Sequence, residues 1–118
     1  MDKNLPVGVI DSGVGGLSVL KVLQQALPHE DFLYIGDTAR TPYGQRPEKE
    51  IRTMVHDLTG YLDNAGIKLL VVACNTITVL GTESIRNGYA FDVVGMSKGA
   101  ELALGVTKNK KIGVMATP

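Results

Sequence analysis

Residues 69–76 read LLVVACNT, an unbroken apolar run that ends in three small polar residues. A run that is apolar on both faces is typical of a buried strand in a parallel sheet covered by helices. The triplet Cys74-Asn75-Thr76 then lies where the chain leaves the strand and the next helix begins. This stretch predicts an α/β fold with a chemically active strand-to-helix junction.

Short apolar runs and helical spacing alternate on both sides of this stretch. Pro47 and Gly66 bound one of the helices, and Asn87-Gly88 is expected to stop the next. The pattern predicts a parallel sheet with helices on both faces, whose ligands lie beyond the carboxyl ends of the strands. We expect strands at 7–10, 32–35, 69–73, 91–94 and 111–116, and helices at 17–27, 47–64, 76–86 and 99–106.

Composition excludes several classes of protein. The 118 residues suffice for one domain at most, and 12 basic against 12 acidic residues give no reason to expect nucleic acid as a partner. No apolar run approaches a membrane span, and no secretory signal is visible. A single cysteine favours a reducing, cytoplasmic setting. No set of His, Asp and Glu has the spacing of metal ligands.

The glycine-rich turn at residues 11–16, DSGVGG, follows a strand and opens a helix. Glycines let a backbone approach a ligand closely, and helix N-terminal amides favour an anion. The alternative is a tight turn capped by Asp11 or Ser12. The spacing fits neither a dinucleotide fingerprint nor a P-loop. Because Asp11 disfavours phosphate, an amino acid, with its own cationic group, is a natural ligand.

Two other segments are expected at the same sheet edge. A helix N-terminus stabilises a thiolate, so Cys74 is a candidate nucleophile or base, although a small core hydrophobe is the commoner role of a free cysteine. Residues 36–44, GDTARTPYG, offer a phenol, exposed amides and a candidate lid, or simply a surface connection. Residues 112–117 faintly echo residues 7–12, as if a second copy of the unit began there.

Taken together, residues 7–17, 36–44 and 71–76 resemble the glutamate racemase family, within the aspartate/glutamate racemase superfamily. The resemblance implies a flavodoxin-like layout that is half of a two-domain, pseudo-symmetric enzyme. It also implies an isomerase that interconverts L- and D-glutamate without a cofactor and, in bacteria, supplies D-glutamate for peptidoglycan. The family moves the α-proton between two cysteines on opposite faces of the substrate.

The resemblance assigns roles to individual residues. Cys74 matches the thiolate that removes the α-proton, and Asp11 is implied to lie beside it and assist. Substrate-binding positions are matched by Asp11, Ser12, Pro42, Tyr43, Gly44, Asn75, Thr76 and Thr117.

The sequence departs from the family pattern in two places. The second cysteine is absent, and Met96-Ser97-Lys98 stands where the family has an apolar residue, Glu and Pro. We therefore expect residues 1–97 to form the N-terminal domain and residues 98–118 to begin a second, truncated one. The isolated chain is then expected to have little or no racemase activity, unless a homodimer brings two copies of Cys74 together. The alternatives are another amino-acid racemase, or a non-catalytic module that binds an amino acid or a partner protein.

Overall fold

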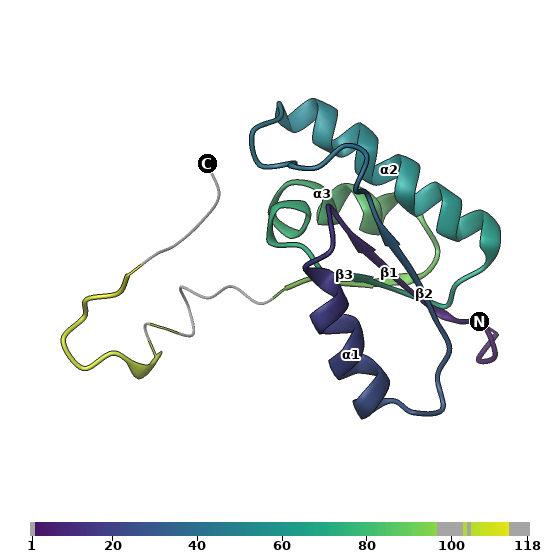
Figure 1. Ribbon diagram of the computed structural model, residues 1–118, viewed down its shortest axis with the longest axis horizontal. Helices are drawn as coiled ribbons and strands as arrows, with labels where there is room; N and C mark the ends of the chain where they lie inside the picture. The colour runs from purple at the N-terminus through teal and green to yellow at the C-terminus, as the bar shows by residue number, and fades with distance from the viewer. Residues whose placement is uncertain (1, 97–102, 104, 114–118) are drawn as a thin grey trace.

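The computed structural model describes residues 2–96, 103 and 105–113. Within them, four parallel strands form one sheet in the order β2-β1-β3-β4, as a flavodoxin-like layout requires. The predicted α/β fold is confirmed (Figure 1). The strands are β1 (Val7–Asp11), β2 (Phe32–Gly36), β3 (Leu69–Val72) and β4 (Asp92–Val94), and the helices are α1 (Gly16–Ala26), α2 (Glu48–Ala65) and α3 (Asn75–Gly88).

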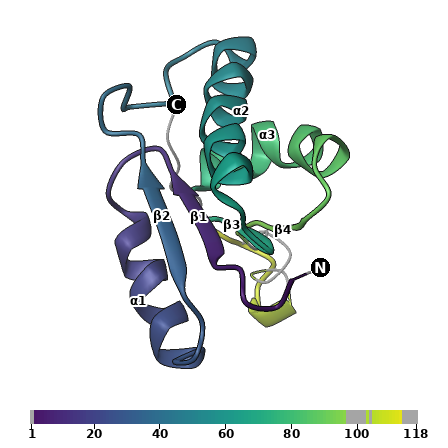
Figure 2. The same cartoon turned by 90° about the vertical axis from the view of Figure 1, so that its right-hand side faces the viewer.

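Helices cover both faces of the sheet. Helix α1 lies on one face, while α2 and α3 pack side by side on the other (Figure 2). Strand β1 is buried at all five positions, and its side chains alternate between two cores. Val9 joins the core under α1, whereas Ile10 joins the larger core under α2 and α3. This alternation decides which face each side chain at the carboxyl edge of the sheet can reach.

The ends of α2 follow the predicted signals. Pro47 immediately precedes the helix, and Glu48 and Glu50 lie in its first turn, where acidic groups favour the helix dipole. Gly66 follows the helix with φ of 90°, a conformation that favours glycine, and its N–H donates to the carbonyls of Leu62 and Asp63. These two signals set the residues at which α2 begins and ends.

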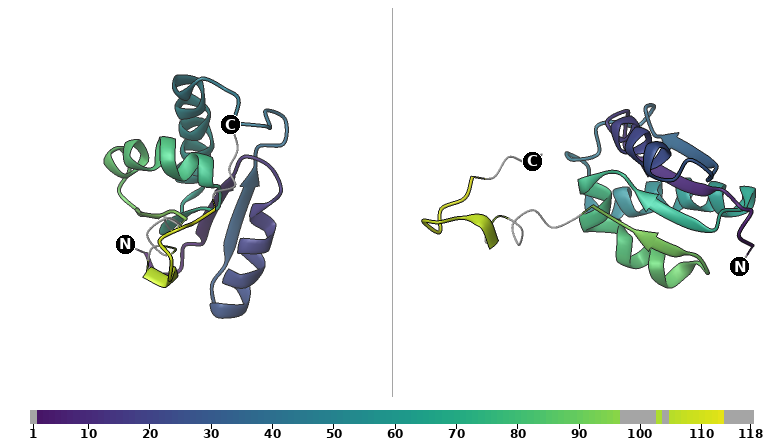
Figure 3. Two further views of the ribbon diagram at one scale, coloured as in Figure 1. Left: turned by 90° about the vertical axis from the view of Figure 1, so that its left-hand side faces the viewer. Right: turned by 90° about the horizontal axis from the view of Figure 1, so that it is seen from below.

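The later elements differ more from the prediction. Helix α3 continues two residues past the predicted end, through Gly88, and stops where Tyr89 becomes extended and stacks on Phe91. Ala103, Gly105 and Val106 are helical, and the described residues 111–113 are not in a strand (Figure 3). The rest of the helix expected at 99–106 and of the strand expected at 111–116 lies outside the described residues.

Candidate functional site

Three segments meet at the carboxyl edge of the sheet: the turn after β1, the loop after β2 and the junction after β3. The backbone N–H of Asp37 donates to the carbonyl of Asp11 (3.0 Å), and that of Ala73 donates to the carbonyl of Ile10 (2.9 Å). Gly36 lies so close to the turn that a Cβ there would meet the Gly13 carbonyl oxygen at 2.1 Å. The expected convergence of the three motifs is therefore present.

Cys74 and Ser12 face each other across this edge. The Ser12 hydroxyl lies 3.3 Å from the Cys74 Sγ, within hydrogen-bond range for sulfur, and both residues are half-buried. Cys74 has an extended backbone and immediately precedes α3, and its carbonyl accepts the N–H and the hydroxyl of Thr78. The thiol thus stands at the positive end of a helix, beside a hydroxyl that can donate to it. This is a setting that suits a thiolate.

The Asp11 side chain is directed toward Tyr34 and the start of α1. Its carboxylate is buried and accepts the backbone N–H of Ser12 (2.7 Å) and of Gly16, the first residue of α1. The side chain of Asp11 therefore occupies the helix N-terminus that the glycine-rich turn presents. The turn connects to Cys74 through Ser12.

Tyr34 completes the turn, and the sequence analysis did not single it out. Its hydroxyl lies 3.1 Å from the Asp11 Oδ2 and 3.0 Å from the Gly13 carbonyl oxygen. Burial, and then the nearby Asp11 carboxylate, raise the pKa of Tyr34 to about 12, so the phenol stays a donor at neutral pH. The signal was available, because a strand places residues 9, 11 and 34 on one face once β1 and β2 are paired.

The loop after β2 is tied down by a buried network. The fully buried Tyr43 donates its hydroxyl to the Asp37 Oδ2, and burial followed by this bond raises the pKa of Tyr43. Arg40 donates to the same Asp37 oxygen (2.6 Å) and to Asp57 of α2 (3.1 Å). The loop motif contains Asp37 and Arg40, but their pairing with Tyr43 and with Asp57 was not expected from the sequence, because the network depends on α2 lying under the loop.

This arrangement changes what the loop offers at the site. The Tyr43 phenol points into the core, and the Thr41–Pro42 peptide bond is cis. Among the described residues, the backbone N–H groups of Tyr43 and Gly44 donate to no protein acceptor. The half-buried Gly44 therefore has a main-chain donor left for another acceptor, whereas the Tyr43 phenol is buried and already bonded to Asp37.

The remaining predicted positions fall in different settings. Asn75 is exposed at the first position of α3, Thr76 is half-buried beside it, and Pro42 is exposed on the loop. Thr117 lies outside the described residues.

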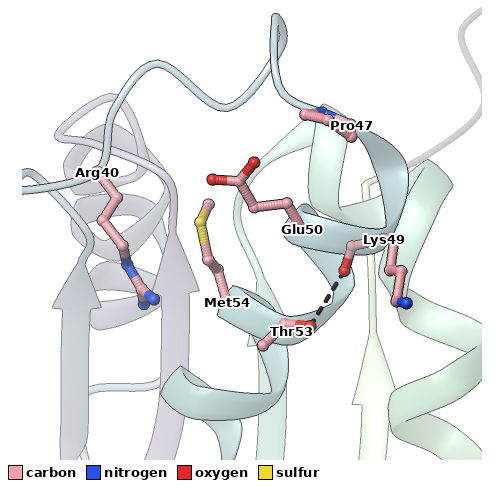
Figure 4. A pocket seen from close by; sticks show the side chains of 6 residues that line it. All are labelled: Arg40, Pro47, Lys49, Glu50, Thr53 and Met54. Atoms are coloured by element: carbon pink, nitrogen blue, oxygen red, sulfur yellow. Dashed lines mark hydrogen bonds between the residues drawn. The ribbon is translucent and has the colours of Figure 1, made fainter.

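Two surface hollows lie beside α2, away from the predicted site residues. One, of about 520 Å³, is lined by residues of the first turns of α2 together with Arg40, which faces Met54 and Glu50 across it (Figure 4). The other, of about 450 Å³, lies beside Ile35, Leu58 and Tyr61. Neither hollow is lined by Cys74 or Ser12.

The described part of the chain offers neither a metal site nor a membrane-spanning helix. Within it, no group of three or more His, Cys, Asp and Glu side chains is arranged to hold a metal ion. The helices found in the same residues are too short or too polar to cross a membrane.

Comparison with known proteins identifies close relatives. No protein-family model matches the chain. Glutamate racemase of Exiguobacterium sibiricum is 46% identical over 115 residues, which make up 97% of this chain and 42% of that protein. The solved structure of glutamate racemase from Aquifex pyrophilus superposes with a TM-score of 0.83 at 38% identity, covering 91% of this chain and 43% of that one.

A second structural relative was solved with a ligand. Glutamate racemase from Francisella tularensis, in complex with D-glutamate, superposes with a TM-score of 0.75 at 36% identity, over 78% of this chain and 35% of that one. The chain spans 42% to 45% of the length of the curated relatives that it matches. These likenesses confirm the resemblance carried by the three motifs and agree with an N-terminal portion of a protein of that kind.

Proposed function

We propose that this chain supplies one catalytic face of a glutamate racemase, an enzyme that interconverts L- and D-glutamate. The observation that carries the proposal is the Cys74 thiol at the start of α3, 3.3 Å from the Ser12 hydroxyl, in a chain closely similar to glutamate racemases. A thiolate is a base suited to an α-proton, and a helix N-terminus together with a hydroxyl donor favours the thiolate form.

The proposed chemistry is a proton transfer in two halves. The Cys74 thiolate takes the α-proton and becomes a thiol, and the electron pair left on the α-carbon spreads into the substrate carboxylate. Donors around that carboxylate stabilise the added charge, and the amide of Asn75 and the backbone N–H of Gly44 are proposed for this role. An acid on the opposite face then returns a proton and inverts the centre. No coenzyme enters this scheme.

The acid on the opposite face is proposed to be a second thiol. The 118 residues contain one cysteine, so that thiol comes from outside them or from a second copy of the chain. We propose that residues 1–97 form the N-terminal domain and that residues 98–118 begin a second one. In the cell, the enzyme is proposed to work in the cytoplasm and to supply D-glutamate for peptidoglycan.

The test is proton exchange in heavy water. The chain is incubated with L-glutamate or D-glutamate, and the α-proton signal is followed by NMR while the enantiomers are assayed separately. A one-sided base should wash out the α-proton of one enantiomer without racemising it. Cys74→Ser should abolish the exchange, whereas Val79→Ala, at an exposed position of the same helix, should leave it unchanged. Exchange that persists in Cys74→Ser, or no exchange although saturation-transfer NMR detects bound glutamate, would refute the role of Cys74.

A further inference from the structure

We propose that Tyr34 is a positioning residue: its hydroxyl holds the turn after β1 and thereby fixes Ser12 against Cys74. The inference deepens the proposed function, because it concerns the thiol to which that function assigns the proton transfer. Tyr34 contacts neither Cys74 nor the sheet face on which Cys74 lies. Its effect has to pass through the turn.

Pairing of the first two strands sets the geometry. Tyr34 stands opposite Val9 in the β1–β2 register, and both side chains lie on the face covered by α1. The phenol extends along that face past Val9 to the end of β1. There its hydroxyl meets the Asp11 Oδ2 at 3.1 Å and the Gly13 carbonyl oxygen at 3.0 Å.

These two contacts lie on either side of Ser12. On one side, the Asp11 carboxylate accepts the Ser12 N–H at 2.7 Å. On the other side, the Gly13 carbonyl oxygen accepts from the Tyr34 hydroxyl, whose single proton it shares with the Asp11 carboxylate. The backbone of Ser12 is therefore restrained from both neighbours, and its hydroxyl is left directed at the Cys74 Sγ on the other face of the sheet. A linked set of hydrogen bonds thus joins Tyr34 to the thiol.

The hydroxyl and the ring of Tyr34 have separable roles. The ring packs beside the apolar cluster of Val7, Val9 and Val71, where a phenylalanine ring would fill the same space. Only the hydroxyl reaches Asp11 and Gly13. Because the raised pKa of Tyr34 keeps this hydroxyl protonated at neutral pH, it acts as a donor throughout the range in which a thiol titrates.

The experiment is a double-mutant cycle read at the thiol. Cys74 is the single cysteine, so alkylation by iodoacetamide reports on that residue alone. The pH dependence of the alkylation rate is measured for wild type, Tyr34→Phe, Ser12→Ala and the double variant. Asp11 of β1 and the loop residues Asp37, Arg40 and Tyr43, which are ionisable groups around this part of the site, are retained in all four chains. Tyr61→Phe, at an exposed position of α2, is the matched control.

We expect Tyr34→Phe and Ser12→Ala each to move the midpoint of the profile upward, by about 0.3 to 1 pH unit, a two- to tenfold change in the thiolate fraction at neutral pH. The double variant should resemble Ser12→Ala, because Tyr34 acts through Ser12. A wild-type midpoint in Tyr34→Phe, or additive shifts in the double variant, would overturn the assignment. So would a Tyr34→Phe chain with altered circular dichroism, because the hydroxyl would then be needed for folding. The alkylation profile does not require turnover of glutamate, so its outcome is separate from that of the exchange experiment.

Discussion

Replacing Gly36 with alanine should disrupt the carboxyl edge of the sheet, because the added methyl group would clash with the backbone of the turn after β1. A Cβ at this position would lie 2.1 Å from the Gly13 carbonyl oxygen, whereas such contacts essentially never fall below 3.0 Å. It would also lie 3.1 Å from the Tyr34 hydroxyl, which bonds to that same carbonyl. The closest obstacle is backbone, so rotation of a side chain cannot relieve the clash. Either β2 or the turn after β1 has to move.

The expected destabilisation combines two effects. Overpacking in a well-packed region costs about 1–3 kcal/mol, and losing the bond between Tyr34 and Gly13 costs about 1 kcal/mol more. The free energy of unfolding should therefore fall by about 3 kcal/mol. With a urea dependence of about 1.5 kcal/mol per molar, the midpoint of urea unfolding, followed by circular dichroism, should fall by about 2 M.

Gly15→Ala is the matched control, because it lies in the same turn region. A Cβ there would meet nothing within 4 Å, and its φ of −59° and ψ of −30° suit alanine. This variant should leave the free energy of unfolding unchanged or raise it by up to about 1 kcal/mol, so its urea midpoint should not fall. Equal midpoints for the two variants would show that the contact between Gly36 and Gly13 does not hold the edge together, and the reasoning would fail.

Three further outcomes are expected. Tyr43→Phe removes a buried hydrogen bond to a carboxylate and should lower the free energy of unfolding by about 2 kcal/mol, while Tyr61→Phe, 68% exposed, should leave the urea midpoint unchanged. The pKa values of Tyr34 (about 12) and Tyr43 are raised in the folded chain, so above about pH 10 the unfolded chain releases protons that the folded chain retains. The free energy of unfolding should therefore be level just below pH 10 and fall from about pH 10 to about pH 12. Urea titrations that show a rise over this range would contradict the expectation. Ile85→Ala, at a fully buried position, should cost about 2–5 kcal/mol in thermal or urea unfolding, against less than about 0.5 kcal/mol for Val79→Ala, which is 81% exposed.

The strands and helices could be predicted from the sequence because buried apolar residues recur along the chain at the spacing typical of each element. An apolar run such as residues 69–73 can satisfy its surroundings only inside the sheet, and the signals at Pro47 and Gly66 act within one turn of the helix they bound. The end of α3 lies at Gly88, within the Asn87-Gly88 pair that was expected to stop it and two residues beyond the predicted bound. The stacking of Tyr89 on Phe91 just after it depends on packing and could not be read from the local sequence.

Some residues of the candidate site could likewise be predicted from the sequence, and others could not. Cys74 and Ser12 could be placed at one edge because both follow parallel strands, and the structure brings them together. The partners of the buried carboxylates could not be read from the motifs. Tyr34 reaches Asp11 only because β2 lies beside β1, and Arg40 reaches Asp57 only because α2 lies under the loop. The resemblance to glutamate racemases named positions in contact with substrate and left these supporting residues unnamed.

The position of β1 in the sheet has a consequence for synthesis on the ribosome. Strand β1 emerges before β2 and β3 and soon pairs with β2, but its other edge is filled only by β3, which follows more than 50 residues after β1 ends. Until then, a strand that is buried at all five positions of the fold keeps unpaired N–H and C=O groups on one edge, which another nascent chain can capture. Ser12 and Cys74 are separated by 62 positions, so on the ribosome their contact cannot form before β3 has been synthesised. A growing chain can therefore complete this edge only once β3 is available to cover the open side of β1.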